Sequence, residues 1–347
     1  MKRFVKCFFC FIDDCLLSNG RTVHIFLLYY DCVYQIGICG EHVMKYYLNK
    51  ELSKMGRKKA PSKIFLYPVV NTFLQMYTCK SDDDVFVKKC YIPGYGGANL
   101  KTFLIEPKNG YNESPCIVFY HGGGFLLRAS KTHYQIAKWY AKKVGCKVVF
   151  ADYRLLPKYK FPVAIEDCFE TYKWVLDNAD ILGISKNKVV LAGDSAGANI
   201  SVAVTMMAKD RNIPCPKGNL LIYPVLDRRM NTASMEKYTD TPVWDSHRNK
   251  MFWKTYLNEY TNEQIKYASP MEAESLMGFP NTYIEVAEFD CLHDEGIEFA
   301  NRLKKENVNV ELYEVKAACH GFEDALNSEL LHKCMERRVR WVGEQFA

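Results

Sequence analysis

The chain has 347 residues, of which 48% are hydrophobic and 25% charged, and its formal net charge is +6. This composition predicts a globular protein with a buried core, and so mild a charge gives no reason to expect a nucleic-acid partner. The fourteen cysteines are scattered, and the one CxxC pair, Cys7 and Cys10, lacks a second pair or paired histidines. We therefore expect no metal, buried thiols and a reducing, cytoplasmic environment.

The first fifty residues contain two apolar runs. The run at 1–12 imitates a secretory signal, but Lys6 interrupts it and acidic residues end it early. The run at 24–39 contains Asp31 and is shorter than the roughly 20 residues that a membrane span needs. We expect both to be helices that pack on the protein, with contact to a membrane surface as the lesser alternative.

From about residue 84, apolar runs alternate with helical periodicity, which indicates a mostly parallel sheet covered by helices. The first two runs are joined by a glycine-rich turn without a helix, so they are predicted to form an antiparallel hairpin at one edge. The predicted strands are 85–92, 101–106, 116–120, 147–151, 189–192, 220–225, 282–288 and 310–315, and the predicted helices are 132–144, 163–176, 195–208, 295–305 and 329–345.

A glycine loop, His121-Gly122-Gly123-Gly124-Phe125, directly follows the third predicted strand. Glycines allow the backbone to turn its N–H groups inward without side chains that would block a substrate. A flexible turn would explain the three glycines alone, but not His121 before them and Phe125 after them in the same loop. The loop is a candidate for the donors that stabilise an oxyanion.

Gly193-Asp194-Ser195-Ala196-Gly197 lies between the fifth predicted strand and a helical pattern. A serine in Gly-x-Ser-x-Gly with these flanks is typical of the nucleophile elbow of α/β-hydrolases. The serine sits there on a sharp turn, and bulky neighbours would collide where strand and helix cross. We expect Ser195 to be the nucleophile and the N–H of Ala196 to be an oxyanion donor.

The last two predicted strands supply the other partners of a serine nucleophile. His320 follows the last strand and is the only histidine so placed, although His293 is a close rival. Asp290 ends the preceding strand, where an open sheet places ligand-facing groups. Asp294 is the reserve acid, but we expect it and Glu295 to be the N-cap and first turn of the next helix. The order serine, acid, histidine is that of α/β-hydrolases.

Together these motifs resemble the hormone-sensitive-lipase-like (family IV) carboxylesterases over about residues 84–345. Further matching segments are Asp152-Tyr153-Arg154-Leu155-Leu156-Pro157 and Ala268-Ser269-Pro270. The resemblance implies the α/β-hydrolase fold, with Ser195, Asp290 and His320 as triad and Gly123, Gly124 and Ala196 as oxyanion hole. Cys291 replaces a usual proline and Arg128 a usual glycine, which puts substrate preference in doubt more than activity.

The resemblance also implies an eight-stranded sheet with a helical cap. The cap would come from the N-terminal segment, 1–83, and from an insertion at about 228–275 in a catalytic domain of 84–347. The implied reaction is hydrolysis of short- to medium-chain acyl esters through an acyl-serine, without a cofactor and with a homodimer as a possible assembly. The alternatives are an amidase like arylacetamide deacetylase and, less favoured because His320 is present, a non-catalytic receptor.

Overall fold

The computed structural model describes residues 45–347 except 111–112, 258–259 and 261–263. Both N-terminal apolar runs, with the predictions made for them, lie outside the described residues. Among the residues that are described, none of the helices has the length and apolar character that a membrane crossing requires.

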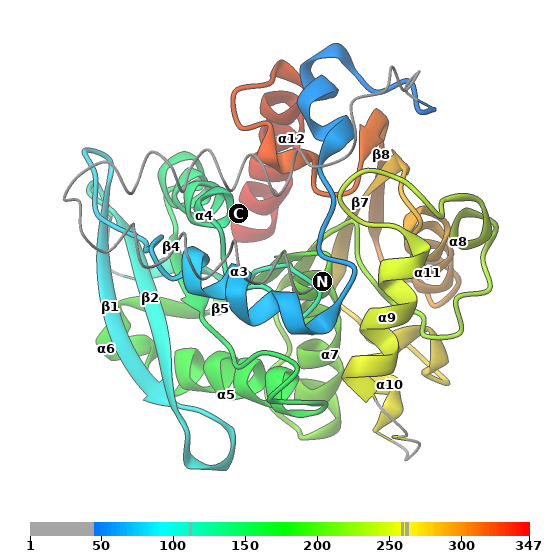
Figure 1. Cartoon of the computed structure of the whole chain (residues 1–347). Coiled ribbons are helices and arrows are strands. Elements are labelled where there is room, and N and C mark those ends of the chain that lie inside the picture. Colours follow the sequence, from blue (N-terminus) through cyan, green and yellow to red (C-terminus); the bar gives the residue numbers. More distant parts are fainter. Residues whose placement is uncertain (1–44, 111–112, 258–259, 261–263) are drawn as a thin grey trace.

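An eight-stranded sheet forms the centre of the molecule, as predicted (Figure 1). Its strand order is β1-β2-β4-β3-β5-β6-β7-β8. The pairs β1–β2 and β2–β4 are antiparallel, which confirms the predicted edge hairpin, and the remaining pairs are parallel. The strands are β1 (Val85–Pro93), β2 (Asn99–Pro107), β3 (Ser114–Tyr120), β4 (Lys147–Ala151), β5 (Ile184–Asp194), β6 (Gly218–Ile222), β7 (Asn281–Phe289) and β8 (Val310–Cys319).

The central strands are apolar because both faces of the sheet are covered. Every residue of β3 and β6 is buried, as expected for strands inside a parallel sheet. The prediction that the sixth strand runs to residue 225 is wrong: Tyr223 has a φ of 35°, outside the β region, so the strand ends at Ile222.

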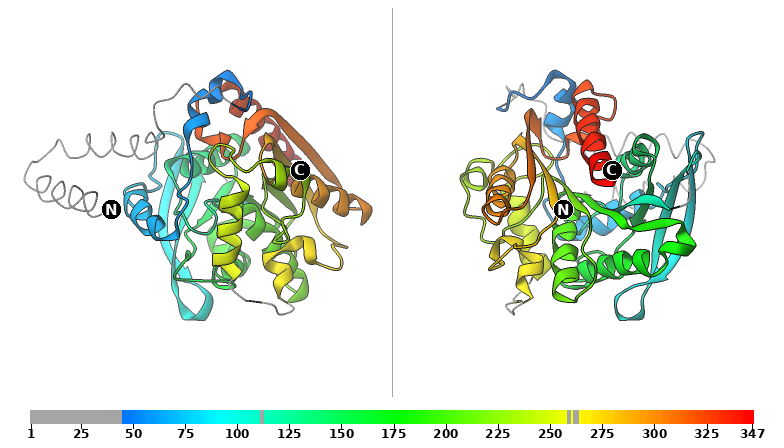
Figure 2. Two further views of the ribbon diagram at one scale, coloured as in Figure 1. Left: turned by 45° about the vertical axis from the view of Figure 1, so that its right-hand side comes forward. Right: turned by 180° about the vertical axis from the view of Figure 1, so that it is seen from behind.

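Helices cover the two faces of the sheet and close two hydrophobic cores. Figures 1 and 2 show α4 (Lys131–Val144) and α12 (Glu329–Phe346) on one face, and α5 (Val163–Asp177) and α7 (Ala196–Asp210) on the other. The short α6 (Ala179–Leu182) follows α5, and α11 (His293–Lys305) packs into the same hydrophobic core as α5 and α7. Asp294 is not the N-cap of α11, since that helix already begins at His293.

The remaining elements lie before β1 and between β6 and β7. The N-terminal segment contains η1 (Lys50–Arg57), η2 (Ile64–Leu66) and α3 (Tyr67–Leu74), and η3 (Tyr95–Gly97) lies in the hairpin turn. The insertion contains α8 (Ala233–Lys237), α9 (Ser246–Leu257), α10 (Ile265–Ala268) and η4 (Pro270–Glu272). An isolated β-bridge joins Lys59 of the N-terminal segment to Val243 of the insertion. The described parts of the two predicted cap pieces therefore touch; their boundaries stay a prediction.

Candidate active site

Ser195 sits at a strained turn between β5 and α7. Its φ of 55° and ψ of −115° lie in a region that residues with a side chain rarely adopt. Its N–H donates to the carbonyl oxygen of Ile222 at 2.8 Å, which holds the turn against the end of β6. A Cβ on Gly197 would lie 1.9 Å from the carbonyl oxygen of Tyr120, and one on Gly193 would lie 2.3 Å from the carbonyl carbon of Gly197. Both glycines are thus required where strand and helix cross.

Ser195, His320 and Asp290 form a continuous chain of hydrogen bonds. Nε2 of His320 is 3.0 Å from Oγ of Ser195, and its Nδ1 is 2.6 Å from Oδ2 of Asp290. The other carboxylate oxygen of Asp290 accepts the N–H of Leu292 at 3.0 Å, which fixes its orientation. All three side chains are buried, and Asp290 is fully so. The structure thus brings together the three residues that the sequence separates by 95 and 30 positions.

The parallel sheet explains this convergence. Ser195 follows β5, Asp290 follows β7, and His320 follows β8. Because these strands are parallel, all three residues lie at the carboxyl ends of the strands, on the same side of the sheet. Gly321, with a φ of 69°, turns the chain after the histidine into η5 (Phe322–Asp324).

The rival residues lie in a different cluster. His293 contacts Asp294 through Nδ1 at 2.7 Å and Glu314 through Nε2 at 3.2 Å. The second oxygen of Asp294 accepts the N–H of Ser234 at 2.7 Å. Neither residue has a hydrogen bond to His320 or Ser195 among the contacts of the described residues.

The glycine loop after β3 presents free backbone donors beside Ser195. Gly123 and Gly124 have φ values of 108° and 61°, which favour glycine. The N–H of Gly122 already donates to Oδ1 of Asp194 at 2.9 Å. In the part of the chain that the structure describes, the N–H groups of Gly123, Gly124 and Ala196 have no acceptor. The resemblance implied these three residues as the oxyanion hole, and that role stays a prediction.

Two histidines, His121 and His133, pack against each other next to the glycine loop. Nε2 of His133 is 3.3 Å from Asp194, and its Nδ1 accepts the N–H of Ser130 at 2.9 Å. Burial raises the pKa of Asp194, but the charge and hydrogen bond of His133 outweigh it, so the net shift is downward. His121 stacks on Tyr153 with ring centroids 4.4 Å apart, and burial, with the charge of His133, lowers its pKa to about 4.

Aromatic side chains from the insertion close the site above the glycine loop. A Cβ on Gly124 would lie 2.9 Å from the Trp244 ring, and the centroid of that ring is 6.3 Å from that of His320. Phe125 stacks on Tyr256 at 4.3 Å and on Phe252 at 5.8 Å. These aromatic rings are buried, so the insertion packs directly against the glycine loop.

Arg128 and Cys291 are the two residues that differ from the usual pattern of the resembled family. Neither has a hydrogen bond to Ser195 or His320 among the contacts of the described residues. The Arg128 guanidinium is 3.4 Å from both carboxylate oxygens of Asp152, so it is directed to an ion pair. Cys291 is fully buried, and this burial raises the pKa of its thiol well above the ordinary value. Its backbone carbonyl oxygen accepts the hydroxyl of Ser234 at 2.9 Å.

A buried ionic network lies behind His320, and the sequence analysis missed it. The Tyr223 ring packs on the imidazole with centroids 4.6 Å apart, and its hydroxyl donates to Glu323. Arg338, which is fully buried, donates to both Glu323 and Glu285. The available signal was Glu285, a carboxylate in the middle of the apolar run 283–287.

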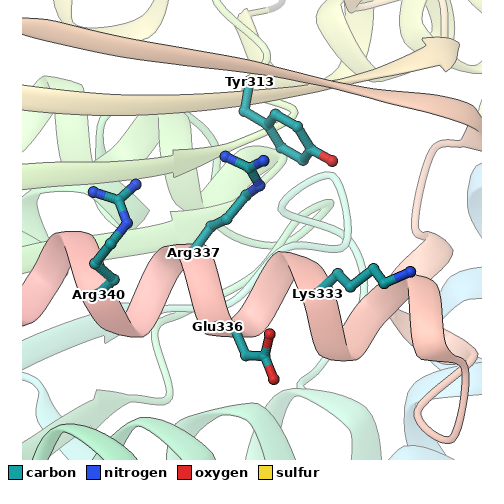
Figure 3. Close-up of a pocket in the computed structure, with 5 residues that line it drawn as sticks. All are labelled: Tyr313, Lys333, Glu336, Arg337 and Arg340. Carbon is teal, nitrogen blue, oxygen red and sulfur yellow. The ribbon is translucent and has the colours of Figure 1, made fainter.

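A separate pocket of about 400 Å³ lies between β8 and α12 (Figure 3). Tyr313, Lys333, Glu336, Arg337 and Arg340 line it, and Arg337 lies over the ring of Tyr313 at 4.3 Å. It contains none of the residues of the candidate site. Within the described residues, no group of three or more His, Cys, Asp or Glu side chains is arranged to hold a metal ion.

Comparison with known proteins identifies the family. A family model described as "alpha/beta hydrolase fold" matches residues 117–324. Carboxylesterase NlhH from Mycobacterium tuberculosis is 34% identical over 235 residues, which cover 66% of this chain and 73% of that protein. Esterase LipW from Mycobacterium marinum superposes with a TM-score of 0.81 at 27% identity, covering 86% of this chain and 96% of that one. A bacterial heroin esterase superposes with a TM-score of 0.79 at 27% identity, covering 87% and 98%.

The chain therefore belongs to the α/β-hydrolase fold family, and its resemblance to the hormone-sensitive-lipase-like carboxylesterases is confirmed. Its named relatives are esterases, carboxylesterases and lipases. The chain spans 64% to 66% of the length of the first three curated relatives that it matches.

Proposed function

We propose that this protein is a carboxylesterase that hydrolyses acyl esters through a covalent acyl-serine. The observation that carries the proposal is the hydrogen-bonded chain from Ser195 Oγ through His320 to Asp290, with distances of 3.0 and 2.6 Å. Such a chain is the arrangement by which a hydroxyl that is weakly nucleophilic on its own becomes reactive toward a carbonyl carbon.

In the proposed reaction, Asp290 holds the His320 tautomer whose Nδ1 is protonated and whose Nε2 faces the serine. Nε2 removes the Ser195 proton as Oγ attacks the ester carbonyl, and then gives that proton to the leaving alcohol. A water molecule, activated by the same imidazole, attacks the acyl-serine and releases the acid.

The three unengaged N–H groups of Gly123, Gly124 and Ala196 suit the oxyanion of the tetrahedral intermediate. Their positions are fixed before the substrate arrives, because contacts with the rest of the fold hold the strained loop and because Ala196 begins α7. A donor of this kind typically contributes on the order of 100- to 1000-fold to kcat.

A short- to medium-chain acyl group is the proposed substrate class. Support comes from the closely packed aromatic side chains above the glycine loop, Phe125, Trp244, Phe252 and Tyr256, each no more than 6% exposed. Apolar walls of this kind bind an apolar acyl chain, and their close packing limits its length.

Replacing Ser195 with alanine tests the proposal. We expect hydrolysis of short p-nitrophenyl esters to fall by at least about 10⁴-fold, with the fold unchanged by circular dichroism. The matched control is Ser201→Ala, a buried serine of α7 whose hydroxyl donates to the carbonyl oxygen of Gly197. Wild-type rates in Ser195→Ala would refute the assignment.

Two further measurements separate the alternatives. A series of p-nitrophenyl esters of increasing acyl length locates the expected optimum at short to medium chains. Paired ester and anilide substrates distinguish an esterase from an amidase. Failure to react with an active-site organophosphonate would favour the non-catalytic receptor.

A further inference from the structure

The backbone of the glycine loop adopts a conformation that the loop cannot hold by itself. Gly123, Gly124 and Phe125 are consecutive residues with φ values of 108°, 61° and 56°. For a residue with a side chain, such as Phe125, a positive φ persists only where the surroundings hold it in place. The contacts that hold residues 122–128 therefore also set where the proposed oxyanion donors point.

Two of these contacts come from the body of the molecule. Asp194 accepts the N–H of Gly122 at 2.9 Å, and the carbonyl oxygen of Phe125 accepts the N–H of Leu156 at 2.8 Å. Within the loop, the carbonyl oxygen of Gly123 accepts the N–H groups of residues 126 and 127, at 3.0 and 2.9 Å.

A third pair of contacts comes from the N-terminal segment. The side-chain amide of Asn71 donates through Nδ2 to the carbonyl oxygen of Leu126 at 2.8 Å. Its Oδ1 accepts the N–H of Arg128 at 2.9 Å. One amide thus pairs with two backbone groups of the loop, one donor and one acceptor, as a neighbouring strand would.

Asn71 is presented by a helix that is itself anchored. In α3, Tyr67 is fully buried and Leu74 is 5% exposed, and these residues lie one turn on either side of Asn71. The hydroxyl of Tyr67 donates to the carbonyl oxygen of Pro61 at 2.9 Å. Figure 1 shows the segment that leads into α3, coloured blue, running across the front of the molecule.

We infer that Asn71 is a positioning residue for the proposed oxyanion hole, through which the N-terminal segment sets the geometry of residues 122–128. The inference rests on the proposed function. Asn71 touches neither Ser195 nor His320 through any hydrogen bond of the described residues, so its effect passes through the loop.

The variant Asn71→Leu keeps the size of the side chain and removes both hydrogen bonds. Because the donors act on the transition state, we expect kcat to fall about 10-fold while KM changes less than 2-fold. The affinity for a trifluoromethyl ketone, which mimics the tetrahedral intermediate, should fall by the same factor as kcat. Asn71→Asp, which keeps only the acceptor for the N–H of Arg128, should be intermediate.

The control is Thr72→Val, since the Thr72 hydroxyl donates to Pro68 within the same N-terminal segment and does not contact the loop. It should retain the kcat and ketone affinity of the wild type. A second measurement, hydrogen exchange of the peptide that contains residues 122–128, does not depend on activity. We expect faster exchange there in Asn71→Leu than in Thr72→Val.

The outcomes separate this inference from the proposed function. If the wild type hydrolyses esters and Ser195→Ala does not, the function stands. In that case an unchanged kcat in Asn71→Leu, or a loss that appears only in KM, overturns the inference. If the wild type is inactive, the proposed function fails, and unchanged exchange at residues 122–128 still overturns the positioning role.

Discussion

His121 is a buried histidine that the fold keeps neutral. Its Nδ1 donates to the carbonyl oxygen of Gly122 at 2.7 Å, while its Nε2 has no partner in the described part of the chain. Burial lowers its pKa from the ordinary 6.5 to about 4. Protonation in the folded state therefore requires either an unsolvated charge at the base of the glycine loop or local opening.

The lowered pKa of His121 predicts that the free energy of unfolding decreases under acidic conditions. The unfolded chain binds a proton at His121 below pH 6.5 and the folded chain only near pH 4, so stability falls as the pH falls through this window. The loss amounts to about 3 kcal/mol from this group. Urea unfolding between pH 4 and 7 should show it, and His121→Asn should flatten the curve. The exposed His247→Gln is the control, and an unchanged slope in His121→Asn contradicts the prediction.

Residues that take part in the proposed chemistry could be predicted from the sequence, and residues that support the site through hydrogen bonds could not. Ser195, Asp290 and His320 each follow a recognisable apolar strand, so strand order alone brought them together. His133 and Asn71 lie on helices, where a polar residue indicates a solvated surface. Only the folded chain shows that both face the glycine loop.

The position of α12 against the sheet depends on a buried ion pair. Arg338 lies between Glu285 of β7 and Glu323 of η5, and all three are buried. This contact ties the helix to the short turn that follows His320. In the sequence, Arg338 belongs to a run of charged residues in a helical pattern that is typical of a solvent-exposed face, which is why the network was missed.

Removing one member of this network should destabilise the fold strongly. We expect Arg338→Met to lower the free energy of unfolding by about 3–5 kcal/mol, because two buried carboxylates lose their partner. Arg340→Met, two residues further along α12, breaks only partly exposed pairs and should cost less than about 1 kcal/mol. Chemical denaturation checks both variants. Equal stabilities would contradict the prediction, and if Arg338→Met does not fold, adding Glu323→Gln should restore part of the loss.

At the scale of the whole molecule, the N-terminal segment joins parts that are far apart in sequence. Lys59 bridges to Val243 of the insertion, and the carboxylate of Glu51 accepts the N–H groups of Glu329 and Leu330 at 2.9 and 3.1 Å. The strand and helix pattern predicted the sheet and its covering helices, because that pattern is local. These contacts join residues that are 184 and 278 positions apart, so they leave no local pattern.

A chain that begins at residue 84 should be much less stable than one that begins at residue 45. The truncation removes the buried side chains of Leu52, Met55, Tyr67 and Leu74, each of which contributes about 2 kcal/mol. It also leaves the first turn of α12 without the Glu51 acceptor. We expect the shorter chain to aggregate or to lose cooperative unfolding in calorimetry. An equal Tm for the two chains would contradict this role.

The bridge between Lys59 and Val243 has a consequence for how the chain is made. A ribosome releases residue 59 long before residue 243, and the N–H groups that donate to Glu51 emerge later still, at residues 329 and 330. Until those residues emerge, Leu52 and Met55 lack part of the core that buries them in the folded chain. The contact between Glu51 and the start of α12 can therefore form only after residues 329 and 330 have been translated.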